Sequence, residues 1–471
     1  MTHEATLMKN IEKLREETRA PFWKALEEAV GGKLGKDICD AMRDLYTLYD
    51  DTMIDWFANL YDPKVGGYYY SNGARDNDTV TYQDVTYDLL PDAESTHQAM
   101  RFICGSGLSG KVGTPSVEVM PPKMKDQIFK FIKGLQDPCG FFYHPQWGKE
   151  LTDKKLSRRA RDLGWCTSIL SEFGEKPTYD TPTGIKGDGL LADGTSVKIK
   201  KCSSGQAADN APTTASVAIP DNMKDKESFL AYLGTLDVKH CSYPVGNTLT
   251  AQTGQLIYRD KVLASEGADY SLADIVIKWL NENQNPENGL WHDKANYYGV
   301  NGLMKISGVY GKIGVLLPNA TAAAKSAIDA MSTDEIPDAA TCVYNTWFAA
   351  ERILRHIRTY GGEEGKKIEA ELLKSLREKA PEAIRITKEK LAIFRKPDGG
   401  FSYCPTHSAA RSQGMPVTHD GLAEGDINAT IICSSDILVY IYASLGLSDY
   451  RVPIFCDADR ERYFGIIKNK L

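Results

Sequence analysis

The carboxylates of this chain that could do acid–base chemistry stand just before apolar helical stretches. Asp92 and Glu94 precede one such stretch, and Glu424 and Asp426 precede another. Hydrolysis of a glycosidic bond needs two carboxyl groups across the bond, one as the acid and one as the base or nucleophile. Carboxylates in these positions also cap free backbone N–H groups and complement the helix dipole. Each of the four is therefore a candidate both for catalysis and for capping.

A second group of residues suits β-elimination from a uronic acid. In that reaction a Tyr or His base removes the proton beside a carboxylate, and an amide or a cation holds the carboxylate. His292, Tyr297, Asn301 and Lys305 could take these roles, and the last three share one helical face at four-residue spacing. Lys305 lies in an otherwise apolar run, where it needs a polar partner or must reach solvent. His144 is a further catalytic candidate.

Aromatic residues accompany these groups. A sugar offers apolar faces for stacking and hydroxyls for hydrogen bonds, so rings beside carboxylates and imidazoles suit a carbohydrate. The chain has 24 tyrosines, many of them in turns, although rings in turns also pack over helix ends without any ligand. The residues that we predict to bind substrate are Asp92, Glu94, Arg161, Trp165, Trp291, Asn301, Lys305, Tyr344, Asn345, His407 and Asn428.

Helices must position these residues, because apolar side chains recur at three- and four-residue spacing over most of the chain. The stretch 427–447 is apolar almost all round, which predicts a helix buried among others. The stretch 363–390 is charged on one side, which predicts an outer helix. The predicted helices are 36–60, 94–105, 121–136, 156–173, 225–236, 270–283, 338–359, 363–394 and 427–447.

Four turns repeat one pattern, in which proline or a turn residue is followed by glycine and then aromatic residues. The proline stops the preceding helix, the glycine permits a left-handed cap, and the rings pack over the helix ends. A more apolar helix starts up to about 25 residues later. We therefore expect each turn to end an outer helix and to lead the chain to an inner one. The four turns are 61–71, 135–146, 282–294 and 394–406.

Three of these turns carry a family resemblance, in Gln136-Asp137-Pro138, Gln284-Asn285-Pro286 and Lys396-Pro397-Asp398-Gly399-Gly400-Phe401. The segment Ala423-Glu424-Gly425-Asp426 then looks like the start of an inner helix. This pattern resembles the α/α-toroid superfamily of terpenoid cyclases and protein prenyltransferases, over about residues 40–450. The resemblance implies an all-α fold, with about six helical hairpins closed in a ring around a central funnel.

The resemblance concerns architecture more than reaction, because such toroids also host glycoside hydrolases and polysaccharide lyases. The D-x-D-D acid motif of the cyclases is absent. The only compact zinc candidate is Cys404 with His407, which lacks a third ligand at suitable spacing. We therefore predict neither a metal nor a cofactor.

Residues 177–222 interrupt the helical pattern. Pro, Gly, Thr, Ser and Asp accumulate there, and Asp193-Gly194 lies between short apolar runs, as in a tight β-hairpin. A long irregular segment in a compact domain is often functional. We interpret it as an insertion in a single domain, 1–471, that could cover a pocket as a lid or be a plain loop.

Composition excludes some partners. The net charge is -7, with 56 basic and 63 acidic residues mixed along the chain, so no basic stripe could neutralise nucleic acid. No apolar run approaches a membrane span and the start does not resemble a secretory signal, which predicts a cytoplasmic protein without a membrane partner. The ten cysteines are scattered singly, as expected for reduced thiols. The oligomeric state stays open.

Together these observations predict an enzyme that acts on a small molecule or an oligosaccharide. The leading hypothesis is cleavage of a glycosidic bond, including that of a uronic-acid-containing oligosaccharide, by hydrolysis or β-elimination in the central funnel. The catalytic candidates are His292, Asp426, Tyr297, Glu424 and His144. The alternatives are an isoprenoid enzyme related to terpenoid cyclases and prenyltransferases, or a binding scaffold without catalysis.

Overall fold

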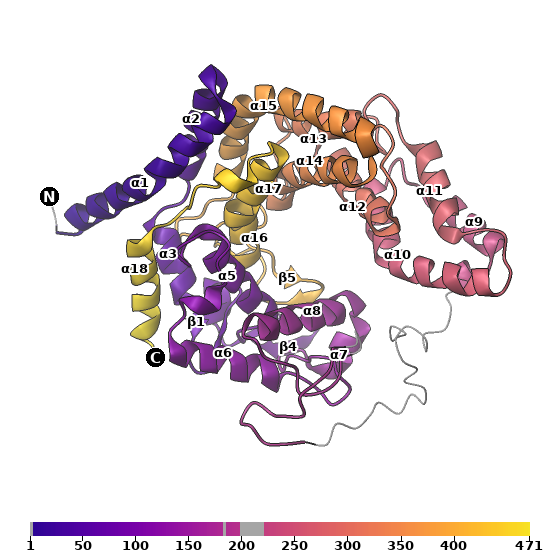
Figure 1. Ribbon diagram of the computed structural model, residues 1–471. Coiled ribbons are helices and arrows are strands. Elements are labelled where there is room, and N and C mark those ends of the chain that lie inside the picture. The colour runs from indigo at the N-terminus through magenta and orange to yellow at the C-terminus, as the bar shows by residue number, and fades with distance from the viewer. Residues whose placement is uncertain (1–2, 182–184, 198–220) are drawn as a thin grey trace.

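The computed structural model describes residues 3–181, 185–197 and 221–471 (Figure 1). The protein is mostly helical, with 60% helix and 6% strand, which confirms the all-α prediction. The helices in the first part of the chain are α1 (His3–Val30), α2 (Gly32–Tyr46), α3 (Asp51–Asn59), α4 (Asn72–Asp76), α5 (Ala93–Ser106), α6 (Pro122–Gly134), α7 (Gly148–Lys154) and α8 (Leu156–Glu172).

The later helices follow residue 221. They are α9 (Lys226–Gly234), α10 (Ser242–Ser265), α11 (Leu272–Asn283), α12 (Tyr297–Ile313), α13 (Ala320–Asp329), α14 (Ala340–Tyr360), α15 (Gly362–Ala392), α16 (Ile427–Ile431), α17 (Ile437–Ser444) and α18 (Asp457–Lys468). The strands form antiparallel two-stranded sheets, β1 (Tyr61–Asp62) with β2 (Gly67–Tyr68), β3 (Thr79–Tyr82) with β4 (Val85–Asp88), and β5 (Arg411–Ser412) with β6 (Met415–Pro416).

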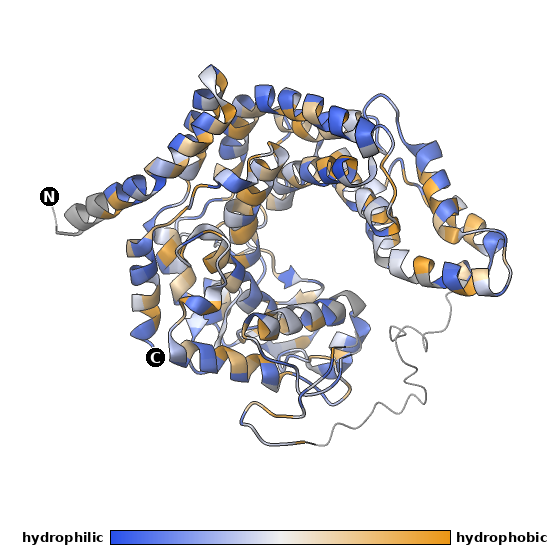
Figure 2. Cartoon of the chain, viewed as in Figure 1, coloured by the Kyte–Doolittle hydropathy of each residue, from blue (hydrophilic) through white to orange (hydrophobic). Residues whose placement is uncertain are grey.

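The more apolar helices contact one another in an order that differs from their order in the sequence. Helix α8 packs against α5, α5 against α16, α17 against α14, α14 against α12, and α12 against α10. These helices follow an arc, and α6, α11, α13 and α15 lie outside it (Figure 1). The hydropathy colouring shows α16 and α17 largely apolar, whereas α15 carries a hydrophilic outer side (Figure 2).

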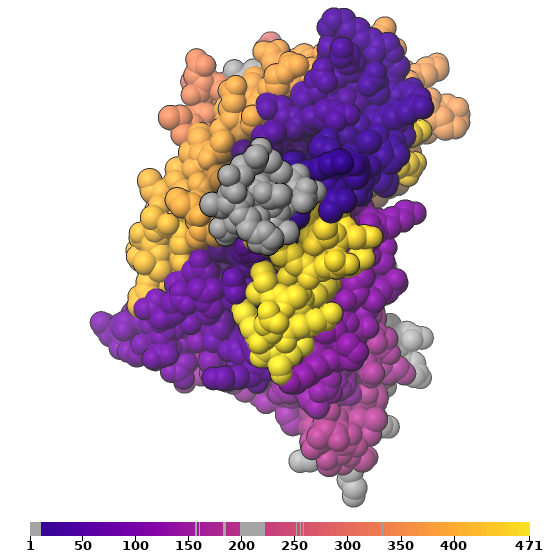
Figure 3. All heavy atoms as spheres, turned by 90° about the vertical axis from the view of Figure 1, so that its left-hand side faces the viewer, coloured from indigo at the N-terminus to yellow at the C-terminus, as the bar shows by residue number. Residues whose placement is uncertain are grey.

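The two ends of the chain pack together. Helix α15 lies against α2, and α18 lies against α3 and α1, as the space-filling view from the side shows (Figure 3). The buried Arg15 of α1 donates hydrogen bonds to Asp459 of α18, the shortest at 2.6 Å, and also bonds Asp51. Arg462 in turn binds Asp55 of α3. These pairs tie the first helices to the last one.

The stretch predicted as a buried helix is confirmed, with an irregularity. Helices α16 and α17 are joined by a π-helical turn, Ile432–Asp436. Among the described residues, 427–444 is the single stretch long and apolar enough to cross a membrane, and 72% of it is buried inside the protein. That degree of burial is expected of the core helix of a soluble protein.

The glycine–aromatic turns follow outer helices as predicted, since α3, α6, α11 and α15 end directly before them. In three of the turns, a residue near the start makes the same kind of contact. The Gln136 amide donates to the Gly140 carbonyl, and the Gln284 amide donates to the Gly289 carbonyl. The Arg395 guanidinium donates to the Gly400 carbonyl in the same way. In each of these three turns, a hydrogen bond from a side chain to a glycine carbonyl thus stabilises the turn.

Two helical predictions differ from the structure. The predicted helix 36–60 is split, because Asp50 caps a new helix by accepting a hydrogen bond from the Thr52 N–H. Helix α10 was not predicted. It contains Gly246, Gly254 and several Thr and Gln residues, so it lacks the apolar periodicity on which our predictions rested. Helices α1, α13 and α18 also lie outside the predicted set.

The predicted insertion is described only in part. Leu190 bridges Ser196 in antiparallel fashion around a turn in which Gly194 has a φ of +83°, which confirms the tight turn at Asp193-Gly194. The rest of the predicted lid, 182–184 and 198–220, lies outside the described residues.

We predict that Arg15→Met lowers the free energy of unfolding by about 3–5 kcal/mol, because it leaves the buried Asp459 carboxylate without its cation. Urea denaturation would measure the change. Lys13→Met is the matched control, since Lys13 is 75% exposed and its ion pair lies on the surface, and it should change stability by less than about 0.5 kcal/mol. Equal urea midpoints for the two variants would contradict the role of Arg15.

Candidate functional site

An ion pair between an exposed arginine and a buried aspartate joins α5 to the π-helical turn. Arg101 Nη2 donates to both carboxylate oxygens of Asp436, at 2.8 and 2.9 Å. The Asp436 side chain is 9% exposed and that of Arg101 is 45% exposed, so the cation reaches open space. Burial raises the pKa of Asp436, and Arg101 opposes the shift. Single π-helical turns inside α-helices occur frequently at functional sites, which directs attention to this pair.

Three aromatic rings stand beside the pair. Tyr344 and Tyr440 have ring centroids 5.3 Å apart, and Phe348 stacks on Tyr440 at 4.4 Å. Burial raises the pKa of Tyr344, and the charge of Asp436 raises it further. All three side chains are partly buried. They provide an apolar wall with two hydroxyl groups.

Several buried polar atoms near this pair lack a hydrogen-bond partner among the described residues. They are His97 Nδ1, Gln98 Oε1 and Ser435 Oγ. The Gln98 amide donates to Asn428 Oδ1 at 3.3 Å. Burial lowers the pKa of His97 to about 4, so its ring is neutral at pH 7. Buried polar groups are nearly always hydrogen-bonded, so these atoms have capacity for a ligand or water.

A second group consists of cations from three helices. Arg161 of α8, Lys305 of α12 and Arg352 of α14 lie close enough that both arginine charges, after burial, lower the pKa of Lys305. Among the described residues, none of the three forms a salt bridge with a carboxylate. Lys305 Nζ lies 5.3 Å from the centre of the Tyr243 ring. The positive charges of these three side chains therefore repel one another, and a bound anion would relieve this repulsion.

Amide side chains lie on the same faces of α12 and α14 as Lys305 and Arg352. The Asn345 amide donates to Asn301 Oδ1 at 2.8 Å, and the Asn301 amide contacts Cys342 Sγ at 3.7 Å. Asn301 lies one turn before Lys305. Trp165 is partly buried, with the Arg161 guanidinium 6.0 Å from its ring. The structure thus brings together Arg161, Asn301, Lys305 and Asn345, while Tyr344 and Asn428 contact the residues around Arg101.

The predicted acids of α5 are held by a buried arginine. Arg158 donates to Asp92, Glu94 and Asp162, and its own side chain is fully buried. Asp92 also caps α5 by accepting from the Ser95 N–H. Ser412 Oγ donates to Glu94 at 2.6 Å. Burial raises the pKa of Glu94 to about 7.

The other two predicted acids hold the start of α16. Asp426 caps this helix through the Ala429 N–H and accepts the Tyr403 N–H, both at 2.8 Å. It is fully buried, and burial raises its pKa to about 7. Glu424 accepts the Gly73 N–H at 2.5 Å. Asp92 and Asp426 therefore cap helices as the capping alternative predicts, and Glu424 accepts a backbone N–H of α4. Among the described residues, Glu94 instead accepts only from the side chains of Arg158 and Ser412.

The predicted histidines contact backbone groups and side chains of turns. His144 is buried with Nε2 2.8 Å from the Pro91 carbonyl and Nδ1 accepting from the Gln146 N–H. Burial lowers its pKa to about 4. His292 Nδ1 accepts the Lys294 N–H, and His407 Nδ1 lies 2.8 Å from Thr406 Oγ1. The structure does not bring these imidazoles to the cationic group.

Two more predicted residues lie around the start of α12. Trp291 is fully buried and its Nε1 donates to the Leu280 carbonyl at 2.8 Å. The Tyr297 hydroxyl is buried without a partner among the described residues, and Lys390 of α15 lies 4.7 Å from its ring. Trp291 packs the turn onto α11, and Tyr297 faces the outer helix.

Our sequence reasoning missed several residues of the site. Arg101 and His97 stand four apart on the predicted helix 94–105, and that spacing could have placed them on one face. Asp436 and Tyr440 stand four apart on the apolar stretch 427–447, where a lone carboxylate needs a partner. Tyr243 and Arg352 carried no such signal, because α10 was not predicted and Arg352 lies among other charged residues.

Comparisons with known proteins returned no family model, no curated protein and no solved structure that matches this chain. Within the described part of the chain, no three His, Cys, Asp or Glu side chains gather in a way that could hold a metal ion. The assignment of function therefore depends on the geometry of the site.

We predict that, between pH 5 and pH 8, the stability of the wild-type protein decreases relative to that of Glu94→Gln. The histidines whose pKa burial lowers to about 4 act in the opposite direction in both proteins, so their effect cancels in this difference. The folded-state pKa of Glu94, about 7, lies above its ordinary value of 4.5. Its contribution is therefore complete below the ordinary value and is lost as the pH rises through 7, by up to about 3 kcal/mol.

Urea denaturation at the two pH values measures this slope. Glu118→Gln is the control, because Glu118 is an exposed glutamate, and this variant should keep the wild-type slope. The interpretation fails if Glu94→Gln and the wild type lose the same stability between the two values.

Proposed function

We propose that this protein is a carbohydrate-active enzyme that cleaves a uronic-acid-containing oligosaccharide, inside an α/α-toroid of about six helical hairpins. The observation that carries the proposal is the group of Arg161, Lys305 and Arg352, cations from three helices without a carboxylate partner among the described residues. The aromatic side chains beside them suit a sugar ring.

The toroid accounts for the order in which the helices pack. Six inner positions, α8, α5, α16 with α17, α14, α12 and α10, succeed one another in space. The charge of Arg161 on α8 also reaches Tyr243 on α10, so the two ends of this succession approach each other. In a ring of this kind, side chains from distant repeats face one interior.

An anionic sugar would stabilise the cationic group. Like charges repel one another, and the two arginine charges lower the pKa of Lys305 for this reason. A uronate carboxylate between Arg161 and Arg352 would replace this repulsion with charge-assisted hydrogen bonds. Tyr243 offers a ring close to Lys305 for the sugar face.

Elimination suits this site better than hydrolysis. A hydrolase needs two free carboxyl groups across the bond, whereas Asp92, Glu94, Glu424 and Asp426 hold the fold and Asp436 is paired with Arg101. In β-elimination the base takes the proton beside the carboxylate, a carbon–carbon double bond forms, and the bond to the leaving oxygen breaks. Arg161 and Arg352 hold the carboxylate, and Lys305, in the neutral form that its lowered pKa favours, is our candidate base. The Tyr243 hydroxyl is our candidate acid for the leaving oxygen.

The isoprenoid alternative expects an interior of aromatic and aliphatic groups with few charges. The described residues place Arg161, Lys305 and Arg352 together instead. Incubation with a panel of uronate-containing oligosaccharides tests the proposal, because elimination produces an unsaturated uronate that absorbs ultraviolet light. Binding without any product would favour the scaffold alternative, and release of reducing ends without that absorbance would favour hydrolysis.

We predict that Lys305→Met lowers kcat/KM on the cleaved oligosaccharide at least about 100-fold, because it removes the base. The urea midpoint should stay unchanged or rise, since a repelled, partly buried cation is lost. Lys325→Met, at an exposed position on α13, is the control and should retain wild-type kinetics. A loss of stability that parallels the loss of activity would assign Lys305 to packing.

A further inference from the structure

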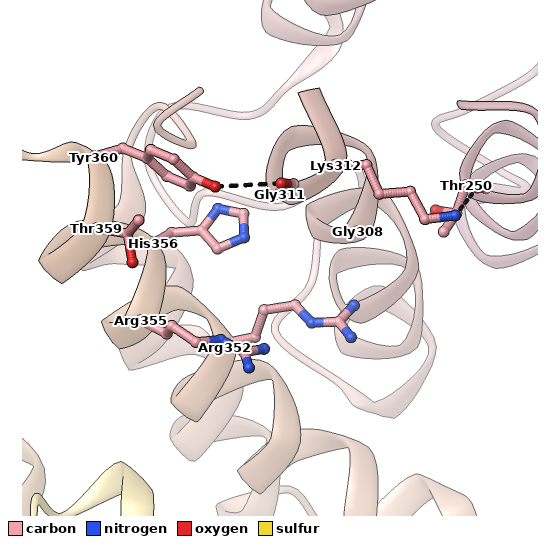
Figure 4. Close-up of a pocket in the computed structure, with 9 residues that line it drawn as sticks. All are labelled: Thr250, Gly308, Gly311, Lys312, Arg352, Arg355, His356, Thr359 and Tyr360. Carbon is pink, nitrogen blue, oxygen red and sulfur yellow. Dashed lines mark hydrogen bonds between the residues drawn. The ribbon is translucent and has the colours of Figure 1, made fainter. Parts of the chain in front are cut away.

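A cavity of about 290 Å³ opens between the C-terminal halves of α12 and α14, with Thr250 of α10 at its side (Figure 4). It shares Arg352 with the group of cations described above. Its volume is close to the lower end of the range for small-molecule pockets. Nothing in the proposed cleavage uses the residues of its outer part.

The cavity is lined by cationic side chains. Lys312, Arg352 and Arg355 all face it. Lys312 Nζ donates to the Thr250 carbonyl at 2.6 Å, and Arg352 Nη1 donates to the Met304 carbonyl at 2.8 Å. These contacts engage the cations without neutralising them. Glu351 lies 3.6 Å from Arg355, and within the described part of the chain no other carboxylate forms a salt bridge with a cation of this lining, so the charge of the lining stays positive.

A buried imidazole adds a free polar atom. His356 is 5% exposed, and its Nδ1 has no partner among the described residues. Its ring points from α14 toward Gly311 and the space beside Arg352 (Figure 4). Tyr360 covers the ring at a centroid distance of 5.7 Å, and the Tyr360 hydroxyl donates to the Gly311 carbonyl.

Glycines keep the cavity open on the α12 side. A Cβ atom at Gly311 would lie 2.8 Å from His356 Nε2, and one at Gly308 would lie 3.3 Å from Arg352 Nη1. A larger residue at either position would displace a side chain of the lining. Helices α12 and α14 therefore lie too close together here for residues larger than glycine at these two positions.

We propose that this cavity binds a tetrahedral oxyanion carried on a sugar, a phosphate monoester or a sulfate ester. Donors from Lys312, Arg352, Arg355 and His356 approach from two helices, which suits an ion with oxygens in several directions better than a planar carboxylate. The volume exceeds that of the bare ion, and the rings of His356 and Tyr360 offer a surface for the sugar. This inference does not require that the protein cleaves any sugar.

Isothermal titration at constant ionic strength tests the proposal, with inorganic phosphate, inorganic sulfate and acetate as probes. Phosphate or sulfate should bind the wild type, and acetate should bind at least about tenfold more weakly. Arg355→Gln and Lys312→Gln should each raise the Kd at least about tenfold. Both positions are exposed, so the variants should fold. Arg385→Gln, at an exposed position on α15, is the matched control and should bind as the wild type does.

A second series identifies the source of the anion. A hexose phosphate that binds more tightly than inorganic phosphate supports a phosphorylated sugar, and a hexose sulfate that binds more tightly than inorganic sulfate supports a sulfated one. The proposal is overturned if acetate binds as well as the tetrahedral ions, or if Arg385→Gln weakens binding as much as Arg355→Gln. It is also overturned if neither ester binds. Lys305→Met, which alters the proposed cleavage, should leave phosphate binding intact, so the two proposals can fail separately.

Discussion

The placement of every inner side chain depends on how the inner helices begin. Asp92 and Asp426 each cap such a helix, and each is followed four residues later by a threonine whose hydroxyl accepts a backbone N–H from a glycine–aromatic turn. Tyr68 and Phe401 supply these N–H groups. One short motif thus joins cap, helix and turn, and it sets the rotation of the helix about its axis.

This motif explains why acids at the helix starts were visible in the sequence but serve the fold. A carboxylate that accepts two backbone N–H bonds, as Asp426 does, fixes the start of its helix against the turn beside it. Arg158 holds Asp92 and Glu94 in a comparable way. Arg161, Lys305 and Arg352 form no salt bridge with a carboxylate among the described residues, and their positive charge favours an anionic ligand.

Periodicity and turn chemistry predicted most helices and all four glycine–aromatic turns, because both depend on residues within one or two helical turns. Lys305 was found as a cation in an apolar run for the same reason. Arg101 and Asp436 lie 335 positions apart in the sequence. Nothing in the sequence near either residue indicates that the two side chains form an ion pair. Helix α10 was missed because its face toward α12 is made of small and polar residues, such as Gly246 against Ile306 and Thr250 against the Lys305 carbonyl.

The two anion sites that we propose lie along one helix. Asn301, Lys305, Gly308 and Lys312 of α12 follow one another at spacings of four, three and four residues, which places them on one face. Lys305 and Lys312 are therefore separated by roughly 10 Å along the axis, and Arg352 of α14 borders both sites. A ligand that carries two anionic groups at such a separation would satisfy both cationic regions at once, whereas a ligand with one anionic group would leave one region without an anion.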